Sequence, residues 1–133
     1  MKAVISYAEI LDFVEKNYRI RPTVTTINRN SIELGYKPAP FIPAIELQLS
    51  IRSVSNDMLS LSYDCGAAAI VLLNSAINAI KQHLPSGIVI DVAERRVDIN
   101  LRSFDKLVSV LNYVSISNIF FENDAVNVDL SLA

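Results

Sequence analysis

CGAAAIVLLNSAINAIKQHL, residues 65–84, is the segment around which we expect the chain to fold. It carries no charge before Lys81, and its alanine, leucine and isoleucine content favours a helix. Apolar residues recur at helical spacing, which leaves a narrow polar seam at Asn74, Asn78, Lys81 and Gln82. The pattern therefore predicts a long central helix that is buried on most of its circumference.

Both ends of this predicted helix carry boundary residues. Asp64 can accept hydrogen bonds from the first free backbone N–H groups, so we expect it to be the N-cap. Pro85-Ser86-Gly87 ends the helix. His83, in the last turn, is expected to interact favourably with the last carbonyl groups.

Most of the remaining chain alternates between apolar and polar residues, the period of half-buried β-strands. The clearest run is residues 45–51, IELQLSI. Short turns separate these runs, so the strands are predicted to be antiparallel. A proline-rich connector at residues 37–43 separates the first two hairpins. The predicted hairpins span residues 23–36, 44–63, 88–102 and 116–132.

Two further amphipathic helices are expected, at residues 6–19 and 103–114. Ser6 and Glu9 have the spacing of a capping box, in which each side chain satisfies a backbone N–H of the other. Ser103 is the expected cap of the later helix. These elements together predict one α+β domain over residues 1–133, in which a curved antiparallel sheet of about eight strands packs on the long buried central helix.

Composition excludes several classes of protein. The 133 residues are 51% hydrophobic and carry a net charge of −2, which argues against a sequence-independent grip on nucleic acid or an anionic membrane. One cysteine cannot form an intramolecular disulfide. Acidic Glu9 comes before any apolar core of a signal peptide could form, and Asn74 and Ser75 interrupt the one long apolar segment. We therefore expect a cytoplasmic protein without a transmembrane helix.

No set of residues predicts catalysis. Cys65 at a helix start would be a favourable nucleophile, but it needs a histidine base within hydrogen-bond reach. His83, the only histidine, lies eighteen residues further along, which is about 27 Å in a helix. One cysteine and one histidine so far apart do not suggest a zinc site either. We expect no enzyme activity, no cofactor and no metal.

The hairpin at residues 88–102 has three possible registers, because Asp91 and Asp98 lie on its polar face. A four-residue loop would set the two carboxylates opposite each other, which is unfavourable without a metal or a shared proton. A loop at Ala93-Glu94 pairs Asp91 with Arg96. A loop at Arg95-Arg96 pairs it with Asn100, and charge favours the last two registers.

Some strands carry more apolar residues than one buried face needs. Phe120 and Phe121 are adjacent, so they point to opposite faces, and one of them needs a second cover or lies exposed. Val89 and Met58 pose the same question. Either helices or a rolled sheet cover both faces, or an apolar patch remains for a ligand or a partner.

Two functions are compatible with such a patch. The first is a non-enzymatic binding protein with an apolar groove for a hydrophobic or lipid-like ligand. The alternative is a structural or adaptor subunit whose apolar sheet face is a homodimer or partner interface, with the final strand suited to pairing at a sheet edge. The expected ligand or interface residues are Met58, Val89, Phe120, Phe121, Val126 and Val128.

Overall fold

The computed structural model describes residues 1–37, 40–41, 44–55, 58–80 and 84–132. These residues form nine β-strands, three α-helices and one 3-10 turn. In chain order the elements are β1 (Lys2–Ser6), α1 (Tyr7–Tyr18), β2 (Thr23–Asn28), β3 (Ser31–Tyr36), β4 (Ile45–Val54), β5 (Met58–Asp64), α2 (Ala67–Ile80), β6 (Ile88–Asp91), β7 (Arg96–Asn100), η2 (Leu101–Ser103), α3 (Asp105–Leu111), β8 (Val114–Glu122) and β9 (Ala125–Leu132).

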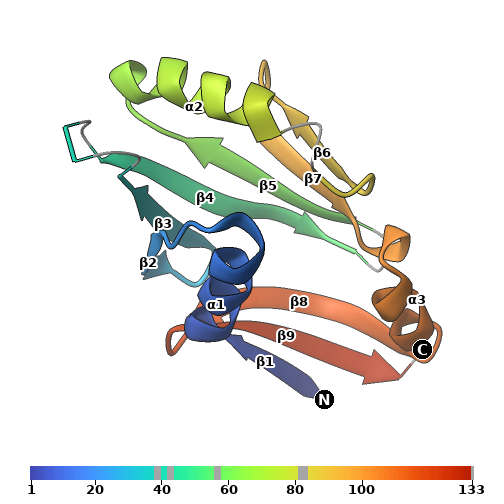
Figure 1. Ribbon diagram of the computed structural model, residues 1–133. Helices are drawn as coiled ribbons and strands as arrows, with labels where there is room; N and C mark the ends of the chain where they lie inside the picture. The colour runs from blue at the N-terminus through green and yellow to red at the C-terminus, as the bar shows by residue number, and fades with distance from the viewer. Residues whose placement is uncertain (38–39, 42–43, 56–57, 81–83, 133) are drawn as a thin grey trace.

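The strands form two antiparallel sheets. The large sheet has the order β2-β3-β4-β5-β7-β6, and the small sheet has the order β1-β9-β8. Figure 1 shows α2 along one end of the large sheet, with α1 and the small sheet at the other end. A cluster of buried residues from α1, β3 and β8, namely Tyr7, Ile32 and Phe121, joins the two sheets.

The predicted α+β fold around a long buried central helix is wrong. The chain is mostly β, and α2 spans only 14 described residues. Its Val71 and Leu72 side chains are 68% and 43% exposed, so the helix is not buried on most of its circumference. The apolar face of the large sheet is shared, because α2 lies over one cavity on it while α1 and the small sheet lie over another. Strand β1, which supplies an edge of that small sheet, was not predicted.

The expected N-cap of α2 is also wrong. Asp64 belongs to β5, and its carboxylate pairs with Arg95 at 3.1 Å. The carbonyl of Gly66 instead accepts hydrogen bonds from the N–H groups of Ala69 and Ile70, at 3.0 and 3.1 Å. The role expected for His83 lies outside the described residues.

The other helices agree in position with the sequence. Ser6 is the N-cap of α1, since its hydroxyl accepts a hydrogen bond from the Glu9 N–H at 3.2 Å. The Glu9 carboxylate accepts from the Ser6 hydroxyl, whereas a full capping box would use the Ser6 N–H. Helix α3 is shorter than expected, and Ser103 does not cap it. The Ser103 hydroxyl donates instead to the Asn100 carbonyl at 2.6 Å.

The β6–β7 hairpin has one of the registers that charge favours. Asp91 lies opposite Arg96, as a turn centred on Ala93-Glu94 predicts. Asp98 lies opposite Val89 and accepts a hydrogen bond from Ser60 at 2.6 Å. The two carboxylates are therefore not placed against each other.

Candidate functional site: an apolar trough on the large sheet

The inner face of the large sheet carries the main candidate site. Alternate residues of β4, β5 and β7 point to this face, because side chains in a strand alternate between faces. Leu49, Leu61 and Ile99 are examples, and all three are only half-buried. We call this partly covered apolar strip the trough.

A cavity of about 350 Å³ lies in the trough beneath α1 and the small sheet. The residues around it are all apolar. They are Ile10 of α1, Ile119, Phe121 and Val126 of the small sheet, and Ile32, Leu49, Ile51, Leu59, Leu61 and Ile99 of the large sheet.

A second cavity, of about 240 Å³, lies between α2 and the same sheet face. It is lined by Leu47, Leu49, Tyr63, Leu73, Ile77, Ile90 and Val97. Leu49 lines both cavities, so they adjoin along one apolar surface. Among the described residues no side chain is less than 2% exposed, whereas the interiors of globular proteins are normally close-packed.

Tyr63 is the one residue in these linings whose side chain has a polar atom. Its side chain is buried, with 4% of the residue exposed, and its hydroxyl has no hydrogen-bond partner in the part of the chain described. Burial raises the pKa of Tyr63, and the neighbouring Cys65 acts in the same direction. Asn74 of α2 carries a second buried oxygen, Oδ1, that has no partner among the described residues. Such groups reduce stability, which marks the underside of α2 as incompletely packed.

Two of the six predicted site residues line the trough. Phe121 and Val126 border the larger cavity, and Val128 follows Val126 on the same face of β9. Strand β9 lies between β1 and β8, so both its edges are already paired. The edge pairing with another chain that was expected of Val126 and Val128 is therefore not available.

Other side chains cover Phe120, which is one of the two outcomes expected for the adjacent residues Phe120 and Phe121. It points to the other face of the small sheet and is only 6% exposed. The Arg29 guanidinium lies 4.1 Å from the centre of its ring, and the Lys2 ammonium lies 5.2 Å away. Arg29 also pairs with Glu122. Phe120 is thus part of a cation–π arrangement and does not present an apolar patch.

Met58 and Val89 are exposed, on the outer face of the large sheet. Polar residues surround them, since Met58 lies opposite Asn100 and Val89 lies opposite Asp98. The six predicted residues thus fall in three separate places. The sequence analysis predicted an apolar groove but not the large-sheet residues that line it, because these residues have the same alternation as any fully covered strand.

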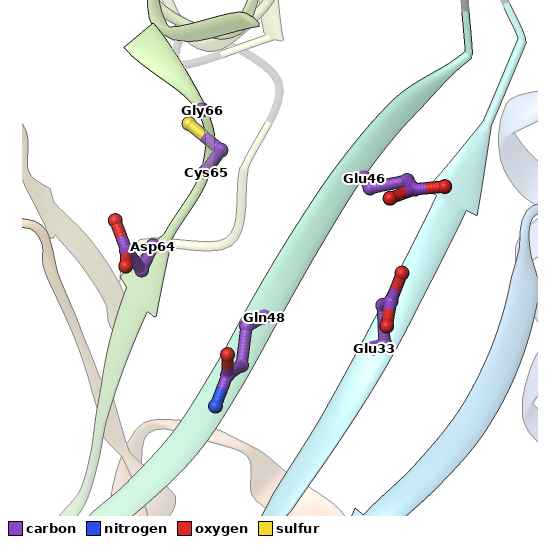
Figure 2. A pocket seen from close by; sticks show the side chains of 6 residues that line it. All are labelled: Glu33, Glu46, Gln48, Asp64, Cys65 and Gly66. Atoms are coloured by element: carbon purple, nitrogen blue, oxygen red, sulfur yellow. The ribbon is translucent and has the colours of Figure 1, made fainter.

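The outer face of the large sheet also carries a polar pocket of about 320 Å³ (Figure 2). Its lining residues are Glu33, Glu46, Gln48, Asp64, Cys65 and Gly66. Glu33 and Asp64 lie on either side of Gln48 in the sheet register. Within the described ranges, no three His, Cys, Asp or Glu residues are grouped closely enough to hold a metal ion. The lining of this pocket therefore does not point to a particular ligand, and we take the trough as the stronger candidate site.

Among the helices described, none combines the length and apolar content needed to cross a membrane. Comparison with protein-family models, with curated proteins and with solved structures finds no match to this chain.

Proposed function

We propose that the protein binds a hydrophobic or lipid-like small molecule in the trough. The observation that carries this proposal is the pair of adjoining cavities that share Leu49 on a half-buried apolar sheet face. Small-molecule sites are typically concave, mostly apolar and about 300–1,000 Å³ in volume. The larger cavity alone lies within that range.

The lining of the larger cavity supports one chemical class of ligand over others. An apolar molecule gains free energy when it leaves water for such a surface, at about 25 cal/mol per Å² buried. A charged group would lose its hydration without finding a partner among the side chains around the larger cavity. We therefore propose a ligand whose buried part is an uncharged hydrocarbon or aromatic group.

The alternative, an adaptor subunit that associates through the outer sheet face, has less support. The exposed apolar residues there, Met58 and Val89, lie opposite polar neighbours. Phe120 is covered by Arg29 and Lys2. Among the described residues, the outer face therefore has no contiguous apolar patch of the kind that such an interface requires.

Titration with N-phenyl-1-naphthylamine, a neutral dye that fluoresces in apolar surroundings, tests the proposal. We expect saturable binding to the wild type. Leu61→Trp places a larger side chain in the main cavity and should weaken binding about tenfold or more. Val89→Trp makes the same kind of change on the exposed outer face and should leave binding unchanged.

Circular dichroism would first establish that both variants are folded. No saturable binding to the wild type, or equal binding by both variants, would show that the trough is only an underpacked core. Loss of binding in Val89→Trp alone would place the ligand on the outer face.

A further inference from the structure

A cavity of about 520 Å³ lies at the end of the large sheet where β2 and β4 begin and β3 ends. It is larger than either cavity of the trough, and its volume is typical of small-molecule sites. Three of its lining side chains are cations, and one is an anion. They are Arg19, Arg21, Lys37 and Glu46. We call this cavity the basic pocket.

The floor of the basic pocket is hollowed at Gly35. In the sheet register Gly35 lies between Thr23 of β2 and Glu46 of β4. A Cβ atom built at Gly35 would lie 2.6 Å from the Thr23 Oγ1, so a larger residue there would have to displace Thr23. The preceding residue, Leu34, packs against the buried cluster that joins the two sheets. Position 35 is therefore on the face opposite the trough, and the basic pocket is a separate site.

Arg19 enters the pocket from a backbone conformation that is unfavourable for arginine. It is the C-cap residue of α1, with φ 58° and ψ 30°, and its N–H donates to the Glu15 carbonyl at 2.9 Å. Glycine is the residue that most often adopts this left-handed conformation at a helix end, because a Cβ atom is strained there. The chain thus places a cation at the pocket at some cost to the stability of the fold.

The cations of the pocket are not all neutralised. Arg21 binds Asp12 and Glu15 at 2.8 Å each, both through Nη1, which leaves its Nη2 and Nε donors unused in these two pairs. The side chains of Arg19 and Lys37 have no hydrogen-bond or ion-pair partner in the part of the chain described. Other arginines do pair with carboxylates, namely Arg29, Arg95 and Arg96.

We propose that the basic pocket binds a small organic anion, whose phosphate or carboxylate group is held by Arg19 and Lys37. Guanidinium and ammonium groups form charge-assisted hydrogen bonds with both kinds of oxyanion. Ile20 and the ring of Tyr36 also line the pocket and offer apolar surface to the body of the ligand.

The surroundings restrict the ligand to one anionic group. Glu46 lines both the basic pocket and the neighbouring polar pocket, which also contains Glu33 and Asp64. These carboxylates would repel an extended polyanion such as nucleic acid. The net charge of −2 on the whole chain acts in the same direction. The proposal is therefore for a small anion.

Isothermal titration calorimetry with phenyl phosphate and with benzoate tests the proposal. At low salt we expect saturable binding of at least one, and the compound that binds more tightly identifies the preferred anionic group. Lys37→Gln should weaken this binding about tenfold, because one charge-assisted contact is lost. Arg52→Gln removes an exposed arginine near the other end of β4 and should leave binding unchanged. Glu46→Gln should strengthen binding, because it removes a repelling charge.

Arg19→Gly gives a result that a purely structural role for Arg19 would not produce. Glycine favours the left-handed conformation at position 19, so this variant should have a higher melting temperature than the wild type. The same substitution removes the guanidinium and should weaken anion binding about tenfold. A variant that is more stable yet binds less tightly separates the site from the fold.

No saturable binding of either compound by the wild type would overturn the proposal. Equal losses in Lys37→Gln and Arg52→Gln, or unchanged binding in both Lys37→Gln and Arg19→Gly, would do the same. Inorganic phosphate that binds as tightly as phenyl phosphate would overturn the assignment to an organic anion. Lys37→Gln should bind the naphthylamine dye like the wild type, because the trough lies on the other face of the sheet, so the two proposals are tested separately.

Discussion

Tyr63 shows how one side chain reports on the packing around it. Its ring lines the cavity beneath α2, while its hydroxyl is buried and has no partner among the described residues. A buried hydroxyl that has lost its water and gained no hydrogen bond costs about 1–3 kcal/mol. Removing the oxygen while keeping the ring should therefore stabilise the protein.

We expect Tyr63→Phe to raise the free energy of unfolding by about 1 kcal/mol at neutral pH, measured by urea denaturation. Tyr113→Phe is the matched control, because Tyr113 is largely exposed and should tolerate the change. A loss of stability in Tyr63→Phe would mean that the hydroxyl makes a favourable hydrogen bond after all.

The same residue predicts a pH dependence. Burial raises the pKa of Tyr63 above its usual value of 10.0. Between the two pKa values the unfolded chain loses the phenolic proton while the folded chain keeps it. The contribution of the neutral Tyr63 side chain to the free energy of unfolding is therefore fully present below pH 10.0. It is lost as pH rises through the folded-state pKa. The wild type should lose more stability than Tyr63→Phe between about pH 9 and pH 11, a range set by that reference value.

At the level of single elements, the sequence predicted the strands better than the helices. Alternation placed the hairpins, and opposite charges on Asp91 and Arg96 agreed with the observed register. The burial of α2 was predicted wrongly, because an uncharged helix has the same sequence pattern whether it is covered on all sides or exposed on one. Nothing local in residues 65–84 distinguishes the two.

Gly87, directly before β6, makes a close contact with Asn100 and Ser103, and this contact can be tested by substitution. A Cβ atom built there would lie 1.6 Å from the Ser103 Oγ and 3.0 Å from the Asn100 carbonyl oxygen. The Gly87 carbonyl also accepts a hydrogen bond from the Asn100 N–H at 2.7 Å, so the two segments cannot easily separate. The close approach requires glycine.

Gly87→Ala should therefore lower the free energy of unfolding by about 1–3 kcal/mol, as measured by thermal or urea denaturation. Gly66→Ala is the matched control, because a Cβ atom added at Gly66 would have no atom within 4 Å. The control should be neutral or slightly stabilising. Equal effects of the two substitutions would contradict the packing argument.

At the scale of the whole molecule, the candidate site depends on which element covers which face. The sequence predicted Phe121 and Val126 as site residues, and they do border the trough. It could not predict Leu49 or Leu61, because their alternation states only that one face is apolar. How completely a face is covered depends on contacts between segments distant in the chain.

The most distant of these contacts joins β1 to β9, and it can be weakened selectively. Met1 and Leu130 exchange backbone hydrogen bonds of 3.0 and 2.8 Å. In an antiparallel ladder such pairs alternate, so Ala3 should also donate its N–H to β9 while Val4 does not. Ala3→Pro should therefore lower the free energy of unfolding by about 1 kcal/mol more than Val4→Pro. Hydrogen exchange or urea denaturation would measure the difference, and equal losses would contradict this register.

The β1–β9 pairing also bears on the order in which the chain can fold during synthesis. Met1 and Leu130 are separated by 129 positions, so β1 leaves the ribosome long before its partner exists. Every strand of the large sheet precedes β8 and β9 in the chain. The nascent large sheet can therefore form while its inner face still lacks the small sheet. During that interval it would expose the apolar surface that chaperones recognise and that promotes aggregation.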